Sequence, residues 1–281
     1  MNAGASHGAV KIALFQMTSG IDPRANALAI THAAKQAKGE GAAMLFTPEM
    51  CGLLDRDRKR ATPNIVAEGD SPVLAAAQQA ARENGIWIDL GSLAVLRKDG
   101  KWANRGFVID AGGAIAARYD KIHMFDVALA SGETWRESAA YTPGDQVVSV
   151  QTPLGRMGMA ICYDVRFPAL FEALGQMRCD AIRIPAAFTV PTGKAHWHLL
   201  QRARAVEASA WVIAAAQAGH HDDGRDTYGH SLVIDPWGDV VLDMGDTAGL
   251  GFAIVDPVRT GEVRSQLPSL ANKREIPKSA P

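Results

Sequence analysis

The sequence contains few cysteines and no long apolar run. Its three cysteines are an odd number for a chain of 281 residues and include no CxxC pair, so they predict neither a disulfide framework nor a cysteine-ligated zinc site. No stretch of 18 apolar residues occurs, so the sequence predicts no membrane-spanning helix. We therefore expect a protein that works in a reducing compartment.

The chain also lacks an excess of charge of either sign. Lys and Arg total 29 while Asp and Glu total 30, which gives a formal net charge of −1. This balance gives no reason to expect a nucleic-acid partner or an electrostatic attachment to a membrane. Residues 1–10 contain neither a basic patch nor the apolar segment of a signal peptide, so we expect a soluble, cytoplasmic protein.

The composition is typical of a globular protein. Apolar residues make up 47% and charged residues 21% of the chain. A chain of this length buries roughly three quarters of its unfolded surface. No linker divides the sequence, so we expect one domain over residues 1–281. Residues from about 268 to 281, rich in Pro, Lys, Arg and Ser, are expected to form an extended tail.

The first half of the chain alternates strand and helix signals. Asp22-Pro23 and Ser71-Pro72 each offer an N-cap followed by proline at the first helical position, so each predicts the start of a helix. Asp99-Gly100 and Gly112-Gly113 are typical of hairpin turns and predict antiparallel pairing. Strands are predicted at residues 10–17, 43–47 and 86–94. Together these signals indicate a mixed sheet.

The second half repeats this order of elements. Helices are predicted from about Pro168 and from about Lys194, and the second would bury an apolar stripe formed by Leu199, Ala203, Val206 and Ala210. Strands are predicted at residues 147–152, 156–162, 181–188, 211–218, 230–235, 239–244 and 250–255. Periodicity alone indicates an α/β or an α+β fold. Residues 120–145 show no sustained period, and we expect this long loop to border a functional site.

Cys162 is the first candidate for chemistry. It ends the apolar segment 156–162 and is followed by Tyr163-Asp164-Val165-Arg166-Phe167-Pro168. A thiol at such a strand-to-turn junction can meet backbone N–H groups and a helix dipole that favour its thiolate. The alternative is that Cys162 fills core volume, as most free cysteines do.

Two other segments place charged side chains at predicted strand ends. Residues 45–50 carry Glu49, and residues 119–126 carry Lys121. Taken singly, Glu49 is compatible with a helix N-terminal carboxylate and Lys121 with an exposed loop lysine. Their occurrence with Cys162, in order and each at a strand end, favours one shared site.

The three segments resemble the Glu-Lys-Cys triad of the nitrilase (carbon-nitrogen hydrolase) superfamily, and the resemblance extends over nearly the whole chain to the turn at residues 235–238. Within the superfamily the chain is most similar to the deaminated glutathione amidase branch, through residues 162–168, 185–189, 195–197 and 228–231. The resemblance implies an α/β fold, a four-layer α-β-β-α sandwich with mixed sheets.

The resemblance also implies roles for individual residues. Cys162 would attack the carbonyl carbon and Glu49 would carry protons. Lys121 would stabilise the oxyanion together with a backbone N–H, most plausibly that of Tyr163. Related enzymes carry a second glutamate that positions the lysine or the substrate, a role that we assign to Glu137, with Glu133 of the same loop as the competitor.

Three further groups bear on substrate and metal binding. Ala187 lies in the motif at residues 185–189 and is expected to contact substrate. Arg166 matches the geometry of a substrate carboxylate, although a structural ion pair with Asp164 or another acid is the simpler interpretation. The histidines at 196 and 198 and the cluster at residues 220–223 raise the question of a metal. The polarity expected of loops explains these histidines better than a metal site does. The triad chemistry requires neither a metal nor a cofactor.

Two segments depart from the family pattern. Residues 51–60 are unusually charged for a segment that can help to shape the pocket, which leaves the identity of the substrate open. Arg183 interrupts an otherwise apolar strand, and it predicts a partner carboxylate or an interface facing that strand.

The resulting hypothesis is hydrolysis of a small carboxylate-bearing amide through a thioester acyl-enzyme, with release of ammonia, of the deaminated glutathione amidase type. The alternatives are an ω-amidase acting on 2-oxoglutaramate or 2-oxosuccinamate, an N-carbamoyl amide hydrolase, and, in a different class, a non-catalytic interaction protein. The expected partners are the small-molecule amide and further copies of the chain, in a homodimer or larger homo-oligomer.

Overall fold

The computed structural model describes residues 8–128, 132 and 134–277, and its main feature is a pair of six-stranded sheets. The first sheet has the order β16 (Gly249–Val255), β1 (Val10–Gln16), β2 (Met44–Phe46), β3 (Trp87–Leu96), β4 (Trp102–Ile109) and β5 (Ile115–Asp120). The second has the order β15 (Val240–Asp243), β14 (Leu232–Ile234), β11 (Trp211–Ala214), β10 (Ala181–Arg183), β9 (Gly155–Met159) and β8 (Ser149–Thr152).

Both sheets are built on one plan. Three neighbouring strands run parallel in each, β1, β2 and β3 in the first sheet and β9, β10 and β11 in the second. The flanking strands pair antiparallel to them. The predicted mixed sheet is therefore confirmed.

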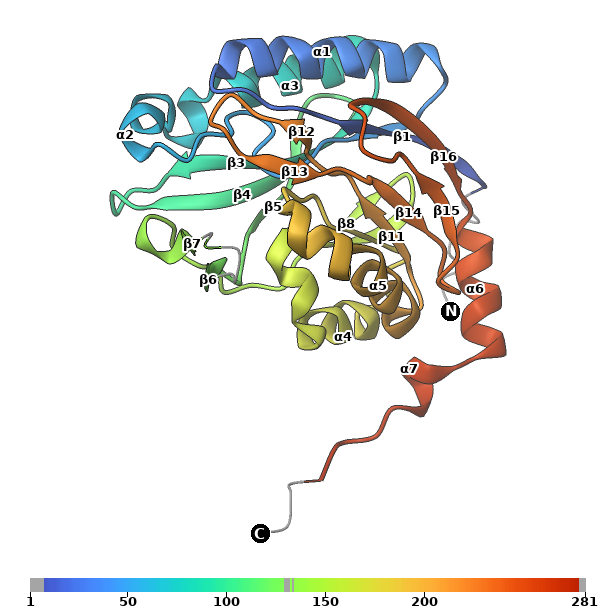
Figure 1. The fold of residues 1–281 in the computed structure, drawn as a ribbon. Coiled ribbons are helices and arrows are strands. Elements are labelled where there is room, and N and C mark those ends of the chain that lie inside the picture. Colours follow the sequence, from blue (N-terminus) through green and yellow to red (C-terminus); the bar gives the residue numbers. More distant parts are fainter. Residues whose placement is uncertain (1–7, 129–131, 133, 278–281) are drawn as a thin grey trace.

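Helices cover the outer face of each sheet (Figure 1). The first sheet is covered by α1 (Pro23–Gly39) and α3 (Pro72–Asn84), and the second by α4 (Pro168–Gln176) and α5 (Val190–Ala208). The predicted caps start α1 and α3, since the side chain of Asp22 accepts from the Arg24 amide and that of Ser71 from the Leu74 amide. These four layers confirm the predicted α-β-β-α sandwich.

The main core lies between the two sheets. Alternate residues of β1 show how the layers are separated: Ile12 and Leu14 pack toward the second sheet, and Ala13 packs toward α1 and α3. From the second sheet, the inter-sheet core receives Met157, Met159 and Ile213, which share a face with Arg183.

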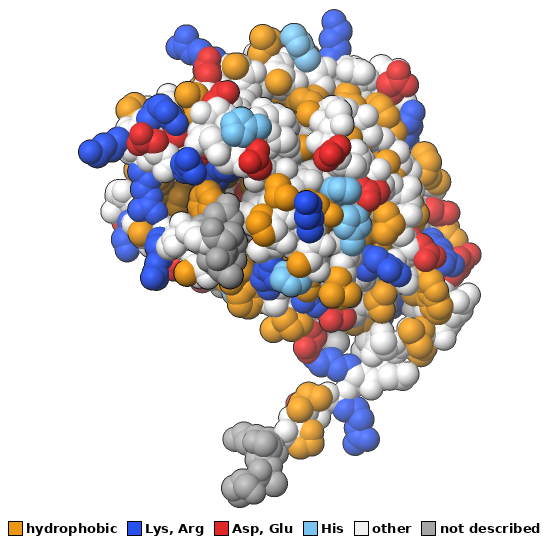
Figure 2. Space-filling model, in the orientation of Figure 1, with side chains coloured by type: hydrophobic (Ala, Val, Ile, Leu, Met, Phe, Trp, Pro, Cys, Tyr) orange, Lys and Arg blue, Asp and Glu red, His pale blue; other side chains and the backbone are white. Residues whose placement is uncertain are grey.

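Shorter elements complete the fold. They are α2 (Arg58–Ala61), α6 (Pro257–Gln266), α7 (Ser269–Asn272), the hairpins β6 (Asp126–Ala128) with β7 (Thr134–Arg136) and β12 (Ala218–His220) with β13 (Asp226–Tyr228), and 3₁₀ turns at Thr62–Asn64, Glu68–Asp70, Glu137–Ala139 and Cys162–Arg166. The segment from α7 to residue 277 leads away from the body in Figure 1. Figure 2 shows side chains of both charge signs spread over the face in view. None of the helices in the described residues combines the length and the apolar character that a membrane span requires.

The buried face of α5 differs from the predicted stripe. Leu199 is 67% exposed and Val206 is 44% exposed, whereas Trp197, Gln201 and Arg204 are buried. The Arg204 guanidinium can be buried because Nε donates to the Val165 carbonyl at 2.7 Å. A count of apolar residues alone could not find this face, because much of it is polar. The helix also begins at Val190, four residues before the predicted start.

Arg183 of β10 joins the two sheets through a fully buried guanidinium. Its Nε lies 3.3 Å from Oδ1 of Asp89 on β3, and its Nη1 donates to the carbonyls of Gly91 at 2.9 Å and Ala160 at 3.3 Å. Burial raises the pKa of Asp89 to about 6, against the opposing effect of Arg183, and burial lowers the pKa of Arg183. The predicted carboxylate partner is thus Asp89.

We expect the contributions of Arg183 and Asp89 to the free energy of unfolding to depend on each other. Removing one partner leaves an uncompensated buried charge, so Arg183→Met or Asp89→Asn alone should lower the free energy of unfolding by about 3–5 kcal/mol. The double variant should lose less than the sum of the two, because neither charge is then left unpaired. Urea unfolding of the four proteins measures the coupling. Strictly additive losses would show that the pair contributes nothing as a pair.

Candidate active site

Glu49, Lys121 and Cys162 meet in one cavity of about 180 Å³. The Lys121 Nζ lies 2.9 Å from the Glu49 Oε1, and the Cys162 side chain lines the same cavity. Their side chains are almost withdrawn from solvent, with exposed fractions of 5% for Glu49, 2% for Lys121 and 7% for Cys162. The three predicted residues therefore form one buried cluster rather than three separate surface features.

The segment after β2 that carries Glu49 is held by a bulge in β3. The Gly91 amide donates to the Thr47 hydroxyl at 3.0 Å, and the Met50 amide donates to the Ser92 hydroxyl at 3.0 Å. A Cβ at Gly91 would lie 2.1 Å from the Thr47 carbonyl oxygen, so only glycine allows this approach. The bulge fixes the point at which the Glu49 carboxylate enters the cavity.

Both oxygens of Glu49 have fixed donors. Oε2 accepts from the Ala187 amide at 3.0 Å, and Oε1 accepts from the Asn104 amide group at 2.9 Å as well as from Lys121. Asn104, on β4, also donates to Glu137 at 3.1 Å. Asn104 was not among the predicted site residues, because its only signal in the sequence is a polar residue inside a strand that the hairpin turns bracket.

Lys121 lies between two carboxylates. Its Nζ is 2.9 Å from Oε2 of Glu137, and that same oxygen accepts from the Phe125 amide at 2.6 Å. Burial acts to lower the pKa of Lys121, but the charges of Glu137 and Glu49 outweigh it and hold the pKa well above its usual value. Lys121 is therefore a permanent cation. Glu137 occupies the place expected for the second glutamate, and Glu133 lies outside the described residues.

Cys162 does not end a strand as predicted. β9 stops at Met159, and Cys162 opens a 3₁₀ turn with a φ of 48°, in the left-handed region that non-glycine residues rarely adopt. Its amide donates to the Pro185 carbonyl at 2.9 Å. Non-glycine residues in this region are characteristic of functional sites, where the surroundings hold the strained backbone.

Asp164 holds the turn in place. Its Oδ2 accepts from the Ile161 amide at 2.9 Å and from the Tyr119 hydroxyl at 2.7 Å. Its Oδ1 accepts from the His123 amide at 3.0 Å. Because Tyr119 and His123 flank Lys121, the fully buried Asp164 ties the backbone on either side of the lysine to the turn that presents the thiol.

The thiol of Cys162 is protonated in the resting site. Burial raises its pKa well above the ordinary value, the negative charge of Glu49 raises it further, and Lys121 only partly opposes them. The expected preference for thiolate is therefore wrong, because burial and a neighbouring carboxylate outweigh the lysine. Glu49, whose charge acts on the thiol from the same cavity, is placed to take its proton when a substrate arrives.

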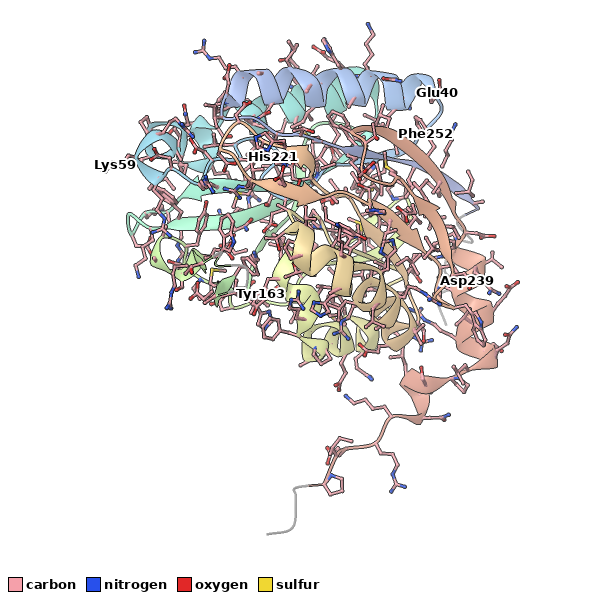
Figure 3. All side chains as sticks on the ribbon, viewed as in Figure 1. Glu40, Lys59, Tyr163, His221, Asp239 and Phe252 are labelled. Carbon is pink, nitrogen blue, oxygen red and sulfur yellow. The ribbon has the colours of Figure 1, made fainter. Side chains whose placement is uncertain are left out.

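Tyr163, Arg166 and Ala187, the expected substrate contacts, all line the cavity. In Figure 3 Tyr163 lies between the β6–β7 hairpin and α4, and its ring packs edge-on against Phe125. Its amide belongs to the first turn of a 3₁₀ helix, where N–H groups lack intrahelical partners.

Arg166 is not paired with Asp164, because Tyr119, His123 and the Ile161 amide occupy that carboxylate. Its guanidinium instead lies 5.5 Å from the Phe188 ring centroid and 3.3 Å from Nδ1 of His196. Among the residues that the structure describes, Arg166 has no carboxylate partner. Its guanidinium can therefore bind a carboxylate group of a ligand in the cavity.

The histidine cluster at residues 220–223 does not converge on a metal site. His221 is buried and bonds to the Ser19 carbonyl and the Thr227 hydroxyl, whereas His220 pairs with Asp226 at 2.9 Å. A different group, His198, His230 and Asp243, places three ligand atoms within 4.8 Å of one another. Each of its histidines already bonds to a separate oxygen of Asp243 at 2.9 Å, which accounts for the arrangement without an ion.

The chain matches a known protein family over most of its length. The profile of the family described as carbon-nitrogen hydrolase matches residues 11–265. The chain is 36% identical over 273 residues to the deaminated glutathione amidase of Yersinia enterocolitica, which covers 96% of this chain and 95% of that protein.

Solved structures give the same result. The crystal structure of the C. elegans NitFhit protein has a TM-score of 0.87 and 34% identity, over 96% of this chain and 66% of that one. An amidase of Nesterenkonia sp. AN1, solved as a glutamate-to-glutamine mutant, has a TM-score of 0.78 and 25% identity over 92% of this chain and 98% of that one. In that amidase, acrylamide has added to the active-site cysteine by Michael addition.

The raised pKa of Cys162 can be measured directly. A thiolate absorbs ultraviolet light at wavelengths below the main aromatic bands much more strongly than a thiol does, so the difference spectrum between the native protein and Cys162→Ala should show no thiolate at neutral pH. Lys121→Met should move the onset of thiolate absorbance to still higher pH, because the substitution removes the positive charge that opposes the rise in the pKa of Cys162. Full thiolate absorbance at neutral pH would contradict the assignment of a protonated resting thiol.

Proposed function

Because the chain belongs to the carbon-nitrogen hydrolase family, we propose that it hydrolyses deaminated glutathione through a thioester on Cys162. The observation that carries the proposal is the convergence of a thiol, a proton acceptor and a permanent cation in one buried cavity. The name of the Yersinia enterocolitica relative, deaminated glutathione amidase, favours this substrate over the alternatives.

The first half-reaction forms the acyl-enzyme. Glu49 takes the thiol proton while Sγ of Cys162 bonds to the carbonyl carbon, and the electron pair of the C=O bond moves to its oxygen. The Nζ of Lys121 and the Tyr163 amide stabilise that oxyanion. When the tetrahedral intermediate collapses, the C–N bond breaks and Glu49 returns its proton to the departing nitrogen.

The second half-reaction frees the product acid. Glu49 removes a proton from a water molecule that attacks the thioester carbonyl, and the same oxyanion contacts are used again. The C–S bond then breaks, and the proton passes from Glu49 back to the sulfur. Glu137 and Asn104 act as positioning residues in both halves, because they hold Lys121 and Glu49 without reaching the reacting atoms themselves.

The substrate fits the groups that face the cavity. Arg166 binds the carboxylate of the acyl part, next to the 2-oxo group that deamination creates. In glutathione the nitrogen of the γ-glutamyl amide belongs to cysteinylglycine, so this reaction yields 2-oxoglutarate and that dipeptide. Ammonia is the leaving group only for primary amides such as 2-oxoglutaramate.

We further propose that the chain acts as a single cytoplasmic domain and assembles into a homodimer or larger homo-oligomer. The exposed Leu199 and Val206 on α5 support the assembly, because a second copy could cover them.

A substrate panel tests the proposed function. Purified enzyme should release 2-oxoglutarate from deaminated glutathione faster than it converts 2-oxoglutaramate or N-carbamoyl-β-alanine. Cys162→Ala should remove all turnover and leave the fold intact, because alanine deletes the nucleophile and little volume. Mass spectrometry with a slow substrate should locate an acyl adduct on Cys162. An adduct on Cys51 or Cys179 would move the active site elsewhere.

The proton carrier and the cation have separate tests. Glu49→Gln and Lys121→Met should each lower kcat at least ~10²-fold, the usual scale for a general base or an oxyanion donor. Single-turnover kinetics should show slow thioester formation in both variants. A rate close to that of the native enzyme in either variant would remove that residue from the mechanism.

A further inference from the structure

The catalytic cavity opens into a second cavity that the proposed reaction has not yet used. This outer cavity has a volume of about 1470 Å³. None of the three triad residues lines it, and neither does Arg166. The two cavities share a rim formed by Arg56, Arg58, Trp135, Arg136, Arg225, Asp226 and Thr227. A substrate that reaches Cys162 with one end can therefore extend past this rim with the other.

The rim carries a surplus of positive charge. Arg56 and Arg58 come from the charged segment at residues 51–60, and Arg136 comes from β7. The Arg58 Nη2 donates to the Arg136 carbonyl at 2.6 Å, which brings the two segments together. Figure 2 shows Lys and Arg side chains gathered on this side of the molecule, over α2 and the β6–β7 hairpin.

The neighbouring carboxylates do not neutralise these arginines. Asp55 is held by Arg60 at 2.7 Å, and Asp57 caps α2 by accepting from the Lys59 amide. Asp223 is paired with Arg225 at 2.6 Å, and Asp226 is paired with His220. Within the described ranges, no salt bridge engages Arg56, Arg58 or Arg136, although Arg136 lies opposite Asp126 in the β6–β7 hairpin and its charge helps to lower the pKa of that carboxyl.

A second observation at the rim is an unused donor. The indole Nε1 of Trp135 is buried and has no hydrogen-bond partner in the part of the chain that the structure describes. The Arg225 guanidinium lies 4.9 Å from the centroid of the same ring. A buried donor without an acceptor is costly, so a ligand with an anionic or carbonyl oxygen fits this wall.

We propose that Arg58 and Arg136 form a subsite for a carboxylate on the leaving amine of the substrate. This inference rests on the proposed function and extends it: the enzyme takes secondary amides that carry a carboxylate on both sides of the scissile bond. Arg166 in the inner cavity binds the acyl side, and the rim binds the amine side. A primary amide would leave the rim unoccupied.

The dimensions suit a dipeptide leaving group. Each extended residue spans about 3.3–3.6 Å, so the terminal carboxylate of cysteinylglycine lies roughly 7 Å from the scissile nitrogen. Arg58 and Arg136 line the inner cavity as well as the outer one, so they flank the space that such a leaving group would fill. Two guanidinium groups from different segments can then share its oxygens in charge-assisted hydrogen bonds.

The experiment removes the charge either from one of the two arginines or from the terminal carboxylate of the substrate. Arg58→Gln and Arg136→Gln should each lower kcat/KM for deaminated glutathione about tenfold, mainly through KM. The kcat/KM of the native enzyme should fall by about the same factor when the substrate ends in glycinamide instead of glycine. On that neutral analogue, and on 2-oxoglutaramate, the two variants should match the native enzyme. Lys59→Gln is the matched control, because Lys59 lies on α2 but lines neither cavity (Figure 3).

The outcomes separate the subsite from the proposed function. Equal losses on charged and neutral substrates, or no loss on deaminated glutathione, would overturn the subsite while the function stands. A native enzyme that hydrolyses none of these amides would overturn the function. Calorimetric titration of Cys162→Ala protein with cysteinylglycine tests the subsite without turnover: Arg58→Gln should weaken binding about tenfold, and unchanged binding would reject the proposal.

Discussion

The burial of Lys121 between Glu49 and Glu137 is the constraint on which the site depends. A cation withdrawn from water is tolerated only when opposite charges and hydrogen bonds compensate it, and here two carboxylates do so, each held in turn by a hydrogen bond from the Asn104 amide group. These groups come from different strands and loops of the first sheet. The sandwich brings them to one edge, where the turn with Cys162 arrives from the second sheet.

Much of this arrangement could be predicted from the sequence, because its signals are local. Asp22-Pro23 and Ser71-Pro72 start helices through their own caps, and the glycine turns impose the antiparallel pairings. The catalytic residues were recognisable because chemistry fixes both their type and their place after a strand. The family resemblance added the fold of four layers and the assignment of Glu137.

What could not be predicted depends on contacts between distant segments. Asp164 follows the nucleophile by two residues, but its partners Tyr119 and His123 are more than forty positions away. The protonation of Cys162 reflects burial and a carboxylate from another sheet, which no local motif encodes. The buried face of α5 was missed for a related reason, because Gln201 and Arg204 point inward and Leu199 does not.

The protonated state of Cys162 has a consequence for oxidative chemistry. Peroxides and other electrophiles attack thiolates far more readily than thiols, so a resting thiol whose pKa lies well above the ordinary value is a poor target for them. Nucleophilicity then arises only while Glu49 holds the proton, during the encounter with an acyl group. The fold thus keeps the sulfur of Cys162 latent until a substrate enters the cavity.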